Sequence, residues 1–322
     1  MRFVVYGAGA VGGVIGARLF QASQNVVLIA RGAHHDAIRD KGLRLICHDE
    51  DVTLPVPVVS HPSELTFTAY DVVVLAMKTQ HTAPALADLA AAASSVPISI
   101  VCAQNGVENE RLALRWFADV YAVCVMCPTG HLEPGVVEAF ASPISGLLDL
   151  GRYPTGLDDR AHSIAASIGT TTFQSIPRAD IMRWKYNKLI MNLSNAANAL
   201  CGSGPAIAEI SARARAEAEG VLRASHIDFV SLEEDTERRG NLLQMKPYGP
   251  GTNRGSSTWQ SLRRGTGSVE TDYLNGEIAM LGRRAGVPTP VNELLQRLCS
   301  EHARLGLPPG SLDPEDLLAQ LG

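Results

Sequence analysis

The first half of the chain alternates short apolar runs with segments whose apolar residues recur at helical spacing. The runs Arg2–Tyr6 and Val26–Ile29 enclose a helical pattern that ends near Ala22, and Ala85–Ala93 carries a second one. Further strands are predicted at Leu43–Cys47, Leu54–Val59, Asp71–Ala76, Ile98–Ala103, Tyr121–Met126, Gly135–Phe140 and Gly146–Leu150. The Asp71–Ala76 run shows no polar alternation, which is typical of a strand buried on both faces. The pattern predicts an α/β fold with a parallel sheet covered by helices on both faces.

Beyond Pro177 the pattern changes, and strand-like runs become rare. Helices are predicted at Asp180–Cys201, Pro205–Ser225, Val269–Ala285 and Val291–Glu301. The segment Thr236–Ser256 is rich in Gly, Asn and Pro, which predicts a loop. We therefore expect an α/β domain over residues 1–177 and a mainly helical domain over residues 178–322.

Composition narrows the class of protein. The 322 residues are 46% hydrophobic and 19% charged, as in ordinary globular chains of about two domains. With 28 Lys and Arg against 33 Asp and Glu, the net charge is −5, so bulk charge favours neither nucleic acid nor an anionic membrane as a partner. The longest weakly polar run, Leu89–Ala103, falls short of the roughly 18 apolar residues that a membrane span needs. The first residues do not form a signal peptide, so we expect a cytoplasmic protein with reduced thiols.

The strongest local motif is a glycine-rich loop directly after the first predicted strand. Its residues are Gly7, Ala8, Gly9, Ala10, Val11 and Gly12, and they open a predicted helix. In a G-x-G-x-x-G loop the first glycine makes the tight turn, the second lets backbone approach a pyrophosphate, and the third lets helix and strand pack closely. The helix N-terminus supplies free N–H groups and partial positive charge. The context therefore predicts a Rossmann-type dinucleotide-binding domain.

The end of the second predicted strand favours one dinucleotide over the other. NAD-preferring sites usually place an acidic residue there to bind the ribose 2′-hydroxyl. Here Ala30 and Arg31 follow the strand, so a cation stands where a 2′-phosphate would lie. The sequence therefore predicts NADP (NADPH) as cofactor.

A polar strip interrupts the first helix predicted in the second half. At about 100° per residue, Lys188, Asn192 and Asn195 fall on one face, and apolar residues cover the rest. One interpretation is a strip that faces a cleft, where desolvation of Lys188 favours acid–base chemistry. The other is an ordinary amphipathic helix whose lysine extends to solvent. The segment by itself does not separate them.

Glu270 opens another helical pattern and also has two interpretations. A carboxylate in the first turn interacts favourably with the helix dipole, and it can equally serve as a ligand for substrate.

Two other motifs are weaker candidates for a redox or metal site. Cys124 and Cys127 have C-x-x-C spacing, but a strand would direct them to opposite faces. The segment His34–Asp36 is expected in a solvated loop, so no metal site is predicted.

Several of these segments occur together, and in order, in one family. They are Gly7–Gly12, Arg31, Ala76-Met77-Lys78, Gln104-Asn105-Gly106, Lys188 with Asn192, Ser256–Gln260, Glu270-Thr271-Asp272 and Asn275-Gly276. With them the chain resembles the ketopantoate reductase (2-dehydropantoate 2-reductase) family over nearly its whole length. Q-N-G, K-x-x-x-N and E-x-D-x-x-N-G in combination are much more specific than the glycine loop.

The resemblance implies roles for individual residues. Lys188 matches the catalytic lysine that donates a proton to the substrate carbonyl, and Glu270 matches a glutamate that helps to hold substrate and cofactor. The remaining matches concern binding: Arg31 to the 2′-phosphate, Lys78 and Asn105 near the cofactor, and Asn105, Asn192 and Ser257 to the substrate. The family usually has a second asparagine eight residues after the lysine, where this chain has Ala196, and Asn195 is the candidate substitute.

The implied reaction is NADPH-dependent reduction of a small 2-oxo acid to a 2-hydroxy acid. The first expectation is 2-dehydropantoate to pantoate, within pantothenate biosynthesis. A different 2-oxo acid is the first alternative, because Ala196 departs from the family pattern. A non-catalytic NADPH-binding sensor is the second, and the presence of both Lys188 and Glu270 argues against it. The helical domain offers a face for a homodimer, although no sequence pattern demonstrates one.

Overall fold

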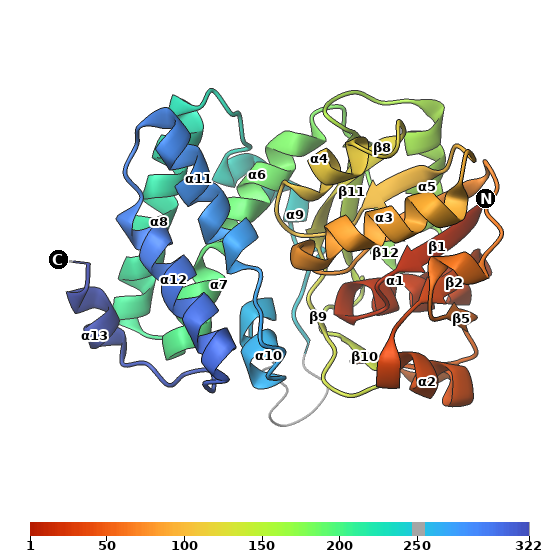
Figure 1. Cartoon of the computed structure of the whole chain (residues 1–322), viewed down its shortest axis with the longest axis horizontal. Coiled ribbons are helices and arrows are strands. Elements are labelled where there is room, and N and C mark those ends of the chain that lie inside the picture. The colour runs from red at the N-terminus through yellow and green to blue at the C-terminus, as the bar shows by residue number, and fades with distance from the viewer. Residues whose placement is uncertain (247–254, 322) are drawn as a thin grey trace. The chain divides into compact units, whose positions relative to one another are not determined.

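A computed structural model of the chain describes residues 1–246 and 255–321 (Figure 1). The described residues form two compact units. Unit 1 comprises residues 1–185 and 231–246, and unit 2 comprises residues 186–230 and 255–321. Unit 1 is an α/β body and unit 2 is helical, which confirms the predicted fold class. The units do not divide at residue 177, because the helix that starts at Ile181 begins in unit 1, and a later segment returns to unit 1.

Unit 1 is built on an eight-stranded sheet. Its strands, in spatial order, are β12 (Phe173–Gln174), β11 (Gly146–Arg152), β8 (Val120–Met126), β7 (Ser99–Cys102), β6 (Asp71–Leu75), β1 (Arg2–Tyr6), β2 (Asn25–Ile29) and β5 (Val58–Val59). Neighbouring strands are parallel except β11 and β8. The chain order reverses at β1, which lies between β2 and β6. At such a switch point the loops after the two strands diverge, and a crevice opens at their carboxyl ends.

Helices cover both faces of this sheet, as the unbroken apolar strands predict (Figure 1). One core joins Phe3 and Val5 to α1 (Ala10–Gln21) and α5 (Asp159–Gly169). The other joins Val4 and Tyr6 to α3 (Thr82–Ala93), which follows the short η2 (Thr79–His81), and to α4 (Asn109–Leu114). Alternate residues of β1 therefore serve opposite cores, as the two-residue period of a strand requires.

A smaller sheet packs on the α1 face. Its order is β4 (Asp51–Leu54), β3 (Leu43–Ile46), β10 (Val136–Ala139) and β9 (Thr129–Gly130). The sequence predicts one strand over Leu54–Val59, but β4 ends at Leu54 and β5 begins at Val58 in the other sheet. Pro55 and Pro57 separate the two, because proline cannot donate to a strand ladder. Short η1 (Pro62–Glu64) follows.

Two helices of unit 1 lie where the sequence predicts loops. His34–Asp36 belongs to α2 (Gly32–Lys41), and the predicted loop Thr236–Ser256 overlaps the end of α9 (Leu232–Arg239). A capping box of Ser231 and Glu234 starts α9, and this signal was readable in the sequence. Residues 247–254 of the predicted loop lie outside the described residues.

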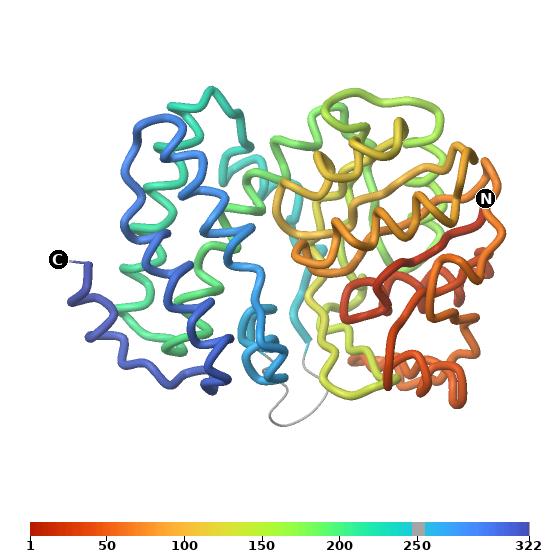
Figure 2. The backbone as a smooth tube through the Cα atoms, in the orientation of Figure 1, coloured from red at the N-terminus to blue at the C-terminus, as the bar shows by residue number. Residues whose placement is uncertain are grey.

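The returning segment that carries α9 is fixed to unit 1 by polar contacts. Figure 2 shows its backbone, in cyan, running back along unit 1. Arg238 donates to both carboxylate oxygens of the buried Asp149 at 2.7 Å. Burial raises the pKa of Asp149, but hydrogen bonds from Arg238 and Arg178 bring it below its usual range. The Lys246 N–H donates to the Phe140 carbonyl at 2.7 Å.

Unit 2 consists of helices. They are the later part of α6 (Ile181–Asn192), α7 (Ser194–Cys201), α8 (Pro205–Ala224), α10 (Ser257–Arg263), η3 (Thr271–Tyr273), α11 (Asn275–Ala285), α12 (Pro290–Leu305) and α13 (Pro314–Ala319). The helices predicted over Asp180–Cys201 and Val269–Ala285 are each broken, at Leu193 and at Leu274. In the described part of the chain, no helix is both long and apolar enough to cross a membrane.

Candidate functional site

The glycine loop has the close approaches that its spacing predicts. Gly7 has φ +99°, which only glycine adopts readily, and a Cβ there would lie 2.6 Å from the Met77 amide nitrogen. A Cβ on Gly12 would lie 2.1 Å from the Gly7 carbonyl oxygen. Both clashes involve backbone, which cannot move aside. The two glycines therefore let β1, α1 and the segment after β6 meet.

Gly9 lies in open space by contrast. A Cβ there would find only the His131 ring, at 4.0 Å. Gly9 is the N-cap of α1, and no side chain caps the helix and no acidic residue occupies its first turn, where Ala10 and Val11 are half-buried. Free N–H groups and open space at one helix start fit the pyrophosphate of a dinucleotide. The loop, which Ala8 completes, thus fits the predicted cofactor.

Arg31 lies where the sequence predicts a 2′-phosphate ligand. It follows β2 and is the N-cap of α2. Its side chain is 59% exposed, donates to the Tyr6 hydroxyl at 3.0 Å and lies 3.8 Å from Asp88. An exposed guanidinium with only weak partners remains available to an incoming phosphate.

His34 links the glycine loop to a distant segment, a role that the sequence did not reveal. Its Nε2 lies 2.7 Å from the Ala8 carbonyl oxygen, and the Gly135 N–H donates to its Nδ1 at 2.8 Å. A backbone N–H can only donate and a carbonyl only accept, so His34 is neutral with its proton on Nε2. Burial, together with His131, whose ring centroid lies 4.2 Å away, lowers the pKa of His34 to about 4.

Lys78 and Asn105 occupy the loops after β6 and β7 and are half-buried. Gln104 connects these loops, because its side-chain amide donates to the Met77 carbonyl and to Thr82 Oγ1, both at 2.8 Å. The predicted cofactor residues of unit 1 therefore all follow the carboxyl ends of β1, β2, β6 and β7, which are neighbours in one sheet.

The predicted substrate residues lie in unit 2, and their arrangement differs from the prediction. Lys188 and Asn192 are on α6, but Asn195 is on α7, so the three do not share one continuous helix face. The break nevertheless brings two amides together, since Asn195 Nδ2 lies 3.5 Å from Asn192 Oδ1. Ala196 is fully buried in the core.

Distant residues determine the shape of this break. The Leu193 N–H bonds the Ile190 carbonyl in a tight turn, and Asn275 Nδ2 donates to the Leu193 carbonyl at 3.2 Å. Asn275 belongs to the E-x-D-x-x-N-G motif, but its own role was not predicted. The Ser256 hydroxyl donates to the Asn195 carbonyl at 3.3 Å, which places Ser257, the first residue of α10, beside α7.

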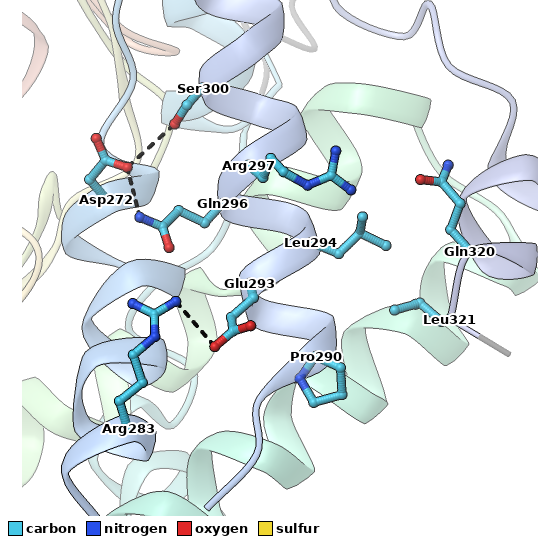
Figure 3. A pocket seen from close by; sticks show the side chains of 10 residues that line it. All are labelled: Asp272, Arg283, Pro290, Glu293, Leu294, Gln296, Arg297, Ser300, Gln320 and Leu321. Atoms are coloured by element: carbon cyan, nitrogen blue, oxygen red, sulfur yellow. Dashed lines mark hydrogen bonds and ion pairs between the residues drawn. The ribbon is translucent and has the colours of Figure 1, made fainter.

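Glu270 is buried at the start of η3. Its neighbour in the motif, Asp272, lines a pocket of about 600 Å³ (Figure 3). There Asp272 accepts from Gln296 and Ser300, and Arg283 pairs with Glu293 at 3.2 Å. None of the residues expected to bind cofactor or substrate is among those lining this pocket. We therefore do not assign the reaction to it.

Within residues 1–246 and 255–321, no three His, Cys, Asp or Glu side chains gather as metal ligands. The sulfur of Cys124 points to the Trp184 carbonyl at 3.6 Å, and Cys127 packs against the core that contains Val123 and Val125. The Cys124 thiol therefore points away from the core against which Cys127, just beyond β8, packs.

Comparison with known proteins identifies the family. The model for the ketopantoate reductase PanE/ApbA matches residues 3–154, and the model for its C-terminal part matches residues 180–303. A 2-dehydropantoate 2-reductase of Mesorhizobium japonicum is 29% identical and covers 94% of this chain and 98% of its own.

The fold of this chain also resembles that of solved structures. A PanE/ApbA family ketopantoate reductase from Ralstonia eutropha has a TM-score of 0.78 at 27% identity, over 95% of this chain and 99% of its own. A D-mandelate dehydrogenase, solved with NADH and anilino(oxo)acetate, has a TM-score of 0.81 at 22% identity, over the same shares. The similarity to the D-mandelate dehydrogenase concerns the fold alone.

Proposed function

From the premise that the chain belongs to the ketopantoate reductase family, we propose that it reduces 2-dehydropantoate to pantoate. The chain is an NADP-dependent oxidoreductase acting on a CH–OH group, which sets aside the alternative of a non-catalytic sensor. The observation that carries the proposed substrate is the cluster of amides at the break between α6 and α7, just after Lys188. Amides in such a cluster suit the carboxylate and hydroxyl groups of a small hydroxy acid.

Each residue has a role in this reaction. Bound NADPH supplies hydride to the substrate carbonyl carbon. Lys188 stabilises the oxygen as it gains negative charge and donates the proton to it. Glu270 orients substrate and cofactor, and Asn105, Asn192 and Ser257 hold the substrate. Gly7–Gly12, Arg31 and Lys78 bind the dinucleotide.

We further propose that Asn195 replaces the family asparagine absent at Ala196. Ala196 is fully buried, whereas Asn195 is half-buried and its amide reaches Asn192. Asn195→Ala should raise KM for the 2-oxo acid roughly tenfold, as expected when one hydrogen bond to a charged group is lost. Asn198→Ala is the matched control, because that amide donates to the Ser194 carbonyl of its own helix. Equal KM values for both variants would contradict the assignment.

A different 2-oxo acid is the second candidate, and the displaced asparagine favours it. NADPH oxidation should be followed by absorbance with 2-dehydropantoate, branched 2-oxo acids and an aryl 2-oxo acid, with NADH in parallel. The highest kcat/KM with 2-dehydropantoate supports the first proposal. A preference of at least tenfold for another acid overturns it in favour of the second.

The same assay tests Arg31. Arg31→Ala should reduce the preference for NADPH over NADH about 10- to 100-fold, because a charge-assisted contact to the 2′-phosphate is lost. NADH kinetics serve as the internal control. An unchanged preference would remove Arg31 from the 2′-phosphate site.

A further inference from the structure

Unit 1 contains a fully buried ion pair that the proposed reaction does not use. Lys185 Nζ lies 2.6 Å from Glu110 Oε1, and the side chains are 2% and 0% exposed. Each charge loses its hydration in the interior, and mutual attraction seldom repays that cost in full. A gain in stability therefore does not by itself explain why this pair is buried, and its other contacts indicate what it does.

Lys185 makes a second contact. Its ammonium donates to the Gln104 carbonyl at 2.9 Å. Gln104 is the first residue of the Gln104–Gly106 turn after β7, and its side-chain amide donates to the Met77 carbonyl after β6. The orientation of that amide is fixed, because the Met77 carbonyl can only accept. A charged group thus holds the backbone at the point where two strand-end loops are joined.

Asn109 completes the connection. Its Nδ2 donates to the Asn105 carbonyl at 3.0 Å and to Thr79 Oγ1 at 3.1 Å, while Thr82 Oγ1 donates to its Oδ1 at 2.8 Å. Gln104, Asn109, Thr79 and Thr82 are all buried. Lys78 lies in one of these loops and Asn105 in the other, so the network fixes the backbone on which both predicted cofactor ligands are mounted.

We propose that Lys185, held by Glu110, is a positioning residue for the nicotinamide cofactor. Its ammonium holds the Gln104 carbonyl and so keeps the loops of Lys78 and Asn105 in their cofactor-binding form. This inference rests on the cofactor site of the proposed function, and it is independent of the substrate. Lys185 acts through backbone and does not touch the reacting atoms.

Two double variants separate positioning from a purely structural role. Lys185→Met/Glu110→Leu removes both buried charges and fills their space with apolar groups. Arg2→Met/Asp71→Asn is the matched control, because that pair, at 2.6 Å, lies at the amino ends of β1 and β6, away from the glycine loop. Thermal unfolding without cofactor and NADPH titration by fluorescence are measured for both, with no substrate present.

We expect the Lys185/Glu110 double variant to unfold within a few degrees of the parent and to bind NADPH at least tenfold more weakly. The Arg2/Asp71 variant should keep the parent Kd for NADPH. Wild-type affinity in a stable Lys185/Glu110 variant would overturn the proposal, as would equal losses of affinity in both variants. Because substrate is absent, failure of the proposed 2-oxo acid specificity would show only in the turnover assay, which distinguishes the two failures.

Discussion

The two units hold their candidate residues by different means. In unit 1 each candidate follows within a few residues of a strand end, and parallel pairing brings the ends of β1, β2, β6 and β7 to one edge. In unit 2 Lys188 lies within α6 and the other candidates lie near helix ends, and the interruption at Leu193 is bonded to Asn275, 82 residues away. The order of residues along the strand edge thus comes from backbone pairing, to which the contacts of Lys185 and Gln104 add support, whereas the helical site depends on long-range side-chain contacts for its shape.

The two sites should therefore respond differently to substitution. The glycine loop is built from closely packed backbone, so an added methyl group should disturb it more than the loss of a side-chain hydrogen bond. The break between α6 and α7 is held by hydrogen bonds from distant amides, so the loss of one such donor should disturb it most. Four experiments test this contrast.

The largest expected effect is chemical and lies in unit 2. Lys188→Ala should lower kcat about 10²- to 10⁴-fold, the usual contribution of a general acid. The Kd for NADPH should stay the same, because Lys188 is not among the residues predicted to bind the cofactor. Lys41→Ala, which removes an exposed lysine of α2, is the control. Turnover within threefold of the parent would remove Lys188 from the chemical step.

The next effect separates two glycines of one loop. Gly12→Ala forces a Cβ to within 2.1 Å of the Gly7 carbonyl oxygen, so the free energy of unfolding should fall by about 1–3 kcal/mol. Gly9→Ala meets nothing nearer than 4.0 Å and should leave stability nearly unchanged while weakening NADPH binding. Denaturant unfolding and NADPH titration measure both. Equal destabilisation by the two variants would refute the assignment of space above Gly9 to a ligand.

Asn275→Asp tests the long-range support in unit 2. The carboxylate keeps the size of the amide but loses the donor to the Leu193 carbonyl, so stability should fall by about 1–3 kcal/mol. KM for the 2-oxo acid should rise, because the break that carries Asn192 and Asn195 loses its fixed shape. NADPH affinity is the control and should not change. A raised KM for NADPH as well would show that this change in unit 2 also weakens cofactor binding.

The smallest effect is a pH dependence in unit 1. The pKa of His34 is about 4 in the folded protein and about 6.5 when unfolded, so the unfolded state binds the extra proton between these values. The stability from neutral His34 is present above pH 6.5 and is lost as pH falls toward 4. His34→Gln, which does not titrate, should flatten the fall in Tm over this range. Parallel Tm profiles for the two proteins would contradict this role.

Much of unit 1 followed from local sequence. The β1 strand, the glycine loop and Arg31 were placed by spacing, because strand, turn and helix start follow one another within a few residues. The helix α2 at His34–Asp36 was missed, since its polar residues show little periodicity. Lys185 was missed too, although Ile181, Trp184, Lys185 and Leu189 share helical spacing. A lysine within such an apolar stripe is the signal that indicates a buried partner.

In unit 2 the helical segments were recognisable, but their breaks were not. Leu193 has ordinary helical backbone angles, and its neighbours carry no proline or glycine. The contact that accompanies the break comes from Asn275, which no local pattern connects to it.

The sequence by itself thus determined the α/β and helical halves and the dinucleotide loop, because these depend on periodicity and on neighbours along the chain, whereas the roles predicted for Lys188 and Glu270 came from the resemblance to a family. Only the tertiary structure decided that α6 stops at Asn192, that Asn195 meets Asn192, and that Lys185 pairs with Glu110 beneath Gln104. Those outcomes depend on hydrogen bonds and ion pairs between residues far apart in sequence, where burial makes each unmet polar group costly and therefore selects its partner.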